Sequence, residues 1–152
     1  MAGTLEPRKW QAFVIDAFEL LLKRDLVASL VIVGKQGWMV ETLVERMGYH
    51  PELDKRLFWF ESISDEQLEA ACVSSACLIA ASCCEGFCLP LFEAAQHKLP
   101  IIPRDIPVVR EVAGSTLFSS TPQSLNNCHS HLSSGLTFTP TTSIHGLTPC
   151  RG

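Results

Sequence analysis

The chain has 152 residues, a formal net charge of −4 and 47% hydrophobic residues, which is typical of a folded domain that buries its own core. The negative charge argues against broad electrostatic binding to nucleic acid, so no nucleic-acid partner is expected. No apolar run approaches the roughly 20 residues that a membrane-spanning helix needs, and no signal-like apolar core follows the N-terminus, so the cytoplasm is the expected location.

Helical and strand-like patterns alternate from the N-terminus to about residue 114. Ser64 and Gln67 carry a capping-box signature for the start of one of the helices. Alternation at this spacing predicts parallel strands in strand–helix units. The expected elements are, in chain order, a helix at 10–24, a strand at 30–33, a helix at 38–47, a strand at 57–60, a helix after Ser64, a strand at 77–81, a helix from Pro90, a strand at 99–103 and a short helix at 107–112.

The first of these helices is amphipathic, with apolar residues recurring every three or four positions. The residues expected on its buried face are Trp10, Phe13, Val14, Ala17, Phe18, Leu21 and Leu22.

The composition changes after Gly114. Residues 115–152 contain no Asp or Glu and a single basic residue, Arg151, with much Ser, Thr and Pro. Such a segment buries too little apolar surface to offset the entropy lost on ordering. We therefore expect a folded unit at 1–114 and a low-complexity, mostly unstructured tail at 115–152.

Seven cysteines are present, an odd number that favours free thiols over a disulfide framework. Cys83, Cys84 and Cys88 lie close together in sequence, but no CxxC pair and no nearby histidine completes a four-ligand set. Accordingly, neither a metal nor any other cofactor is expected.

The segment 80–93 reads as a strand end, a loop and a helix start. Pro90 suits the first helical turn, where a residue without a backbone N–H is tolerated, and Glu85 and Glu93 stand on either side of the turn. The unpaired N–H groups and positive dipole end of such a helix form an anion site.

These residues and their neighbours resemble the retaining glycosyltransferases of the two-domain GT-B type, family 4. The resemblance covers residues 3–114. It is carried by Glu85-Gly86-Phe87, Leu89-Pro90, Glu93-Ala94, Leu99-Pro100, Arg104-Asp105-Ile106-Pro107 and Arg110-Glu111-Val112-Ala113-Gly114, in that order. It implies an α/β fold, with a Rossmann-like parallel sheet and helices on both faces, and the C-terminal, donor-binding half of a mannosyltransferase-like enzyme.

The resemblance also implies roles for individual residues. Lys9 and the turn from Cys88 to Leu91 would hold the diphosphate, while Glu93 would accept hydrogen bonds from ribose and Glu85 from the donor sugar. An ionised carboxylate suits this because it accepts two hydroxyl donors at once. The implied donor-binding residues are Arg8, Lys9, Glu85, Gly86, Phe87, Cys88, Leu89 and Glu93, with Glu85 and Lys9 as the catalytic ones.

By the same resemblance, the expected donor is a nucleotide-diphosphate sugar, GDP-mannose or a UDP-sugar. The glycan or lipid-linked acceptor of polysaccharide assembly would bind through the other domain of the two-domain enzyme. A nucleotide-binding module and an inactive fragment remain alternatives. A dinucleotide-binding domain is disfavoured because no GxGxxG follows a strand.

Two positions depart from the family pattern. Thr4 stands where an arginine usually shares the diphosphate, and Arg8 is expected to compensate in part. Cys88 stands where the family has glycine, so its side chain is expected to obstruct the diphosphate. The alternative for Cys88 is a reactive thiol at a helix N-terminus, where the pKa of a thiol falls.

The resemblance starts after the first strand of the donor domain. Without that strand, the strand at 30–33 and the strand at 77–81 would lack a common neighbour. We expect either direct pairing of the two or filling of the gap by another segment, for which 116–120 is the nearest candidate. The isolated chain is then expected to be marginally stable and prone to associate.

Overall fold

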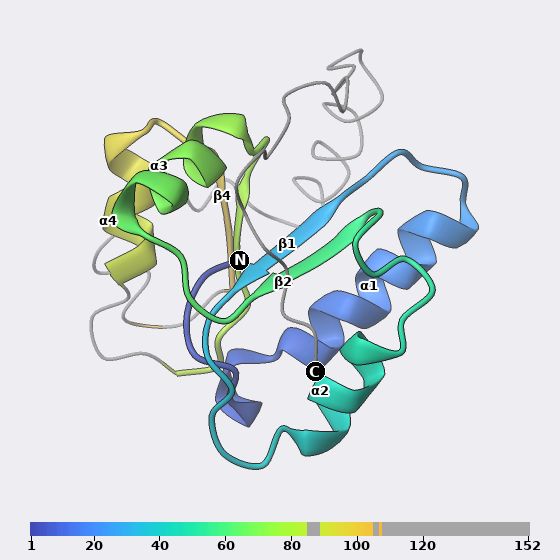
Figure 1. Ribbon diagram of the computed structural model, residues 1–152. Coiled ribbons are helices and arrows are strands. Elements are labelled where there is room, and N and C mark those ends of the chain that lie inside the picture. Colours follow the sequence, from blue (N-terminus) through green and yellow to red (C-terminus); the bar gives the residue numbers. More distant parts are fainter. Residues whose placement is uncertain (85–88, 105–106, 108–152) are drawn as a thin grey trace.

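The computed structural model describes residues 1–84, 89–104 and 107, and it places helices and parallel strands in alternation (Figure 1). Phe87, Gly114, the tail at 115–152 and the segment 116–120 lie outside the described residues, as does all of the expected helix at 107–112 except Pro107. The elements are η1 (Pro7–Lys9), α1 (Gln11–Lys23), β1 (Leu30–Val33), α2 (Glu41–Gly48), β2 (Leu57–Phe60), α3 (Asp65–Ser74), β3 (Leu78–Ala80), α4 (Leu89–Gln96) and β4 (Ile101–Pro103).

The strands form two parallel pairs. β1 pairs with β2 in the register Leu30↔Leu57, and β3 pairs with β4 in the register Leu78↔Ile101. Each pair is joined through a helix, α2 in the first case and α4 in the second, as parallel strands require. The expected α/β fold with a parallel sheet is confirmed.

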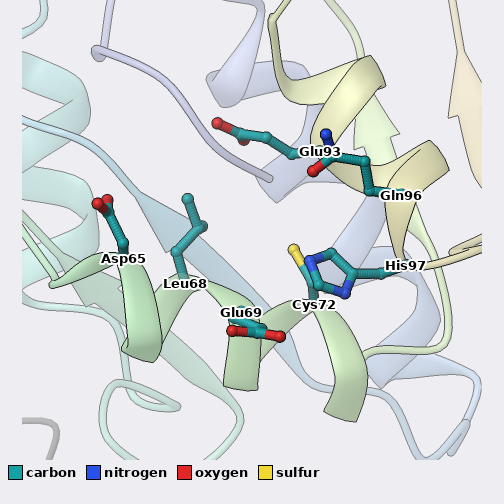
Figure 2. Close-up of a pocket in the computed structure, with 7 residues that line it drawn as sticks. All are labelled: Asp65, Leu68, Glu69, Cys72, Glu93, Gln96 and His97. Carbon is teal, nitrogen blue, oxygen red and sulfur yellow. The ribbon is translucent and has the colours of Figure 1, made fainter.

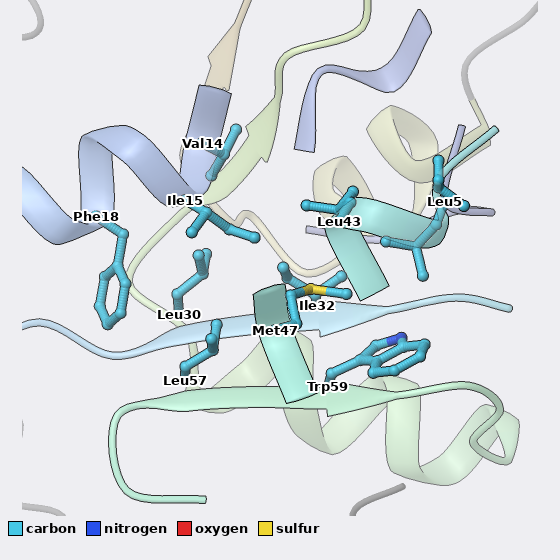
Figure 3. Packing of buried hydrophobic residues seen from close by; sticks show 11 residues of the cluster. Leu5, Val14, Ile15, Phe18, Leu30, Ile32, Leu43, Met47, Leu57 and Trp59 are labelled. Atoms are coloured by element: carbon cyan, nitrogen blue, oxygen red, sulfur yellow. The ribbon is translucent and has the colours of Figure 1, made fainter. Parts of the chain in front are cut away.

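Two hydrophobic clusters lie on opposite sides of β3. Leu78 and Ala80 belong to a cluster with Leu91 of α4, whereas Ile79 and Ala81 pack against the larger cluster beneath α1 and α2. Successive strand residues point to opposite faces, so β3 is covered on both. Figure 3 shows the larger cluster, whose buried members are Leu5, Val14, Ile15, Phe18, Leu30, Ile32, Val40, Leu43, Met47, Leu57 and Trp59.

The buried face of α1 overlaps the expected one only in part: Val14 and Phe18 are buried as expected. Its buried residues are Gln11, Val14, Ile15 and Phe18, while Phe13 is 61% exposed. Trp10 takes a left-handed backbone conformation (φ 56°) just before the helix and stays outside the core. The buried face is therefore rotated about the helix axis by roughly one residue position relative to the predicted face. Both faces satisfy the helical period.

The first residues of the chain run parallel to β1. The amide of Val33 donates to the Met1 carbonyl oxygen (2.9 Å) and the amide of Gly3 donates to the Val33 carbonyl oxygen (2.8 Å). Further along, Leu5 bridges to Gln36. The gap beside the end of β1 is therefore filled by another segment, one of the two expected alternatives, and that segment is residues 1–5.

Two glycines permit this close approach. A Cβ added to Gly34, whose φ is +153°, would lie 2.0 Å from the carbonyl oxygen of Gly3, and one added to Gly37 would lie 2.3 Å from that of Leu5. Both distances are far inside van der Waals contact, so any side chain there would displace the N-terminal segment. The turn at 34–37 is shaped to receive that segment.

The start of α3 is as predicted. The Ser64 hydroxyl accepts from the Gln67 amide and the Gln67 side chain accepts from the Ser64 amide, which completes the capping box. α2 starts later than expected, at Glu41, and leaves Trp38 57% exposed. Among the described residues, no helix is long and apolar enough to cross a membrane.

Candidate functional site

Arg8 joins the N-terminal turn to the loop after β3. Its Nη1 donates to the Cys84 carbonyl oxygen (3.1 Å), and its own carbonyl oxygen accepts from the Cys83 amide (2.8 Å). Its Nε also forms a 2.5 Å ion pair with Glu6. Arg8 is thus placed beside the loop that leads to Glu85, and part of its hydrogen-bonding capacity serves the protein itself.

Lys9 lies over the turn that follows the N-terminal segment. A Cβ added to Gly3 would be 3.5 Å from the Lys9 Nζ atom, so the ammonium is beside Gly3. Pro7 begins η1, and Trp10 closes it with its left-handed conformation. This short turn fixes the direction in which the Arg8 and Lys9 side chains leave the backbone.

α4 begins at Leu89, with Pro90 as its second residue. Leu91 and Ala94 are buried and hold the helix on β3. Glu93 is half-buried, one turn into the helix. Glu85, Gly86, Phe87 and Cys88 lie outside the described residues, so the structure places Arg8, Lys9, Leu89 and Glu93 of the expected site.

Glu93 lines a pocket of about 220 Å³ between α3 and α4 (Figure 2). Asp65 and Glu69 contribute two more carboxylates from α3. Carboxylates accept hydrogen bonds from hydroxyl groups but repel phosphate, so the pocket suits the neutral, hydroxyl-bearing part of a ligand. The other residues that line it are Leu68, Cys72, Gln96 and His97.

Cys72 lies in this pocket near Glu93, and its pKa shows the effect of that carboxylate. Burial raises the pKa of the Cys72 thiol, and the nearby negative charge of Glu93 raises it further. The thiol is consequently a weak nucleophile. No group of three His, Cys, Asp or Glu side chains that could hold a metal ion occurs among residues 1–84, 89–104 and 107.

Two features of this region were not predicted. The Arg104 guanidinium carbon stacks 3.7 Å from the centre of the Trp10 ring, which links the end of β4 to the start of α1. Gln11 is 2% exposed, and its Nε2 donates to the Thr4 carbonyl oxygen, while its Oε1 has no hydrogen-bond partner among the described residues. The signal for Gln11 was its spacing from Val14 and Ile15, which puts it on their face of the helix.

Comparison with known proteins identifies the class of this domain. A family model described as "Glycosyl transferases group 1" matches residues 1–121, and the chain belongs to that family.

Two relatives from Escherichia coli are similar to this chain. The "Serotype-specific mannosyltransferase WbdA" is 54% identical over 113 residues, which are 74% of this chain and 14% of the relative. The "O-antigen chain mannosyltransferase B" is 25% identical over 134 residues, which are 86% of this chain and 34% of the relative. The chain therefore spans about a seventh of the length of WbdA and a third of that of the second relative. The expectation of a glycosyltransferase domain with mannosyltransferase relatives is confirmed.

Proposed function

We propose that this chain is the donor-binding part of a retaining, family 4 GT-B glycosyltransferase that transfers mannose from a nucleotide diphosphate to a glycan or lipid-linked acceptor. The observation that carries the proposal is the position of Arg8 beside the loop that follows β3, with Lys9 next to it in the same short turn and beside Gly3, together with a carboxylate one turn into α4. The similarity to mannosyltransferases supports mannose as the sugar.

The diphosphate would lie against the start of α4. A departing nucleoside diphosphate gains negative charge in the transition state, so cations and amide dipoles that are already in place lower the barrier. Lys9 would supply a cation, and the amides of the first turn of α4 would supply hydrogen-bond donors, as helix starts do. Arg8 would act mainly through the loop that it holds at Cys83 and Cys84.

The nucleoside would extend from the helix start towards the pocket between α3 and α4. Glu93 lies at that pocket and would accept hydrogen bonds from the two ribose hydroxyls. Glu85 would take the same role for the hydroxyls of the sugar. Gly86, Phe87 and Cys88 would form the turn between the two acids.

Transfer itself would need residues beyond this chain, because the acceptor binds through the other domain of a two-domain enzyme. The chain alone is expected to bind donor without turnover. Detectable mannose transfer by the purified chain to an acceptor glycan would contradict this part of the proposal.

Donor titration tests the binding proposal. We expect GDP-mannose to bind more tightly than UDP-glucose in calorimetry, and we expect Cys88→Gly to strengthen binding because the diphosphate gains room. The proposal would be contradicted if GDP-mannose and UDP-glucose bound equally tightly to both wild type and Cys88→Gly. It would also be contradicted if neither nucleotide sugar bound to either protein. Weaker binding by Cys88→Gly alone would show that the cysteine does not obstruct the site.

A further inference from the structure

Trp10 adopts a backbone conformation that its side chain disfavours. Its φ of 56° and ψ of 30° lie in the left-handed region, which a bulky residue enters only at a cost in free energy. Glycine enters the same region without that cost. Strain of this kind persists where surrounding contacts impose it, and such residues cluster at functional sites. The contacts around Trp10 must therefore outweigh the strain.

Two side chains hold the Trp10 indole in place. The Arg104 guanidinium carbon lies 3.7 Å from the centre of the indole ring, and the Phe13 ring meets the indole edge to face, with ring centroids 5.5 Å apart. A cation this close to an aromatic face is attracted by the negative charge of the π system. Arg104 is itself fixed at the end of β4, because its amide donates to the Ala80 carbonyl oxygen (2.8 Å). The stack thus ties Trp10 to the carboxyl end of the β3–β4 pair.

Lys9 lies between two anchored residues. On one side, Arg8 donates to and accepts from the backbone of the loop that follows β3. On the other side, Trp10 is stacked against Arg104. Because both neighbours of Lys9 are held at the carboxyl ends of β3 and β4, the backbone at Lys9 has little freedom to move. The point from which its side chain extends towards Gly3 is therefore fixed as well.

We propose that Trp10 and Arg104 are positioning residues for the donor site, because their stack holds the left-handed turn that directs Lys9 towards the diphosphate. This inference rests on the proposed function, in which Lys9 supplies a cation. Neither Trp10 nor Arg104 needs to touch the donor. A cation that is fixed before the ligand arrives loses less conformational entropy on binding and needs less reorganisation. The strain at Trp10 is the cost of fixing its neighbour.

The test compares donor affinity with stability in two variants. Trp10→Gly removes the ring and the left-handed strain together, whereas Arg104→Gln removes the cation and leaves the ring. We expect each to bind GDP-mannose about fivefold more weakly than wild type in calorimetry, within the range for losing a hydrogen bond to a charged group. Trp10→Gly should nevertheless unfold near the wild-type urea concentration, because relief of strain offsets the loss of a ring that is 36% exposed.

Conservative variants separate positioning from a general structural role. Trp10→Phe keeps a ring against Arg104, and Arg104→Lys keeps a cation over the ring, so each should recover part of the lost affinity. Thermodynamic coupling to Lys9 is the second criterion. In a Lys9→Ala background, Trp10→Gly should cause no additional loss, because the residue through which it acts has been removed.

Asp54→Gly and Arg24→Gln are the matched controls. Asp54 is another exposed residue in the left-handed region (φ 61°), and it precedes the amino end of β2. Arg24 lies at the far end of α1, so Arg24→Gln removes the same charge as Arg104→Gln at a different place. Both controls should bind GDP-mannose as wild type does.

Three outcomes would overturn the inference while the proposed function stands, provided that wild type binds GDP-mannose. The first is wild-type affinity in both Trp10→Gly and Arg104→Gln. The second is a loss in Arg104→Gln alone, which would mean that Arg104 contacts the donor itself. The third is an equal effect of Trp10→Gly with and without Lys9. Absence of GDP-mannose binding by wild type would contradict the proposed function, and this inference with it.

Discussion

The Arg8 guanidinium donates to the carbonyl oxygen of Cys84 across 76 positions of sequence, at 3.1 Å. The Arg8 carbonyl oxygen in turn accepts from the Cys83 amide at 2.8 Å. These two bonds tie the N-terminal turn, which pairs with β1 through the preceding residues, to the loop that follows β3. The tie fixes the relative position of two segments that a parallel sheet brings to the same edge.

Replacing Arg8 should loosen this tie. We expect Arg8→Ala to lower the free energy of unfolding by about 1 kcal/mol, because a charge-assisted bond to a partly exposed carbonyl is lost. Arg8→Lys keeps the charge but cannot contact Glu6 and Cys84 in the same fork geometry, so it should recover only part of the loss. Urea unfolding measures both, and an unchanged midpoint for Arg8→Ala would show that the tie contributes nothing to stability.

Gly34 should tolerate no side chain. In Gly34→Ala the new Cβ would lie 2.0 Å from the Gly3 carbonyl oxygen, so the N-terminal segment must leave β1 or the turn must open. We expect a loss of about 2 to 4 kcal/mol, the range for overpacking combined with backbone strain.

Gly48 provides the matched control for this substitution. A Cβ there would meet nothing within 4 Å, so Gly48→Ala should be neutral or stabilising by up to about 1 kcal/mol. Equal stability of the two alanine variants in thermal unfolding would disprove the packing of residues 1–5 against the turn.

Ser64 should stabilise the start of α3. Ser64→Ala removes the side-chain half of the capping box and should cost about 1 kcal/mol. Ser62→Ala, two residues earlier in the exposed loop, is the control and should be silent. If both variants unfold at the same urea concentration as wild type, the cap has no energetic role.

The alkylation of Cys72 should depend on Glu93. Because burial and then Glu93 raise the pKa of this thiol, its reactive thiolate should form at higher pH than in an ordinary cysteine peptide. Glu93→Gln removes the second cause and should move the pH midpoint of alkylation downward, while Glu45→Gln on α2 should not. Peptide-resolved mass spectrometry follows Cys72 separately from the other cysteines. An unshifted midpoint in Glu93→Gln would place Glu93 away from Cys72.

The strands were predictable because their sequences are unusual locally. Leu30–Val33 and Leu57–Phe60 are short runs of β-branched, leucine and aromatic residues, and the observed strands have those same bounds. The capping box was likewise visible as Ser64 and Gln67. Local patterns of this kind depend on few distant contacts.

The rotation of α1 and the long-range ties were not predictable in the same way. Two stripes on α1 satisfy the helical period, and which of them is buried depends on the distant segments that the helix packs against. The bonds between Arg8 and the loop at Cys83 and Cys84 depend on which strand ends meet, information that no local window holds. The assignment of Lys9 and Glu93 to a donor site rests on the family resemblance rather than on their own surroundings, and it stays a prediction.

The most direct test of the proposed function is donor binding by matched charge variants. We expect GDP-mannose affinity, measured by calorimetry, to fall by about 1 to 3 kcal/mol in both Lys9→Ala and Glu93→Gln, the scale for hydrogen bonds to charged groups. Lys23→Ala at the end of α1 and Glu45→Gln on α2 change the same charges elsewhere and should bind as wild type does. Undiminished GDP-mannose binding by folded Lys9→Ala and Glu93→Gln would contradict the assignment of this site.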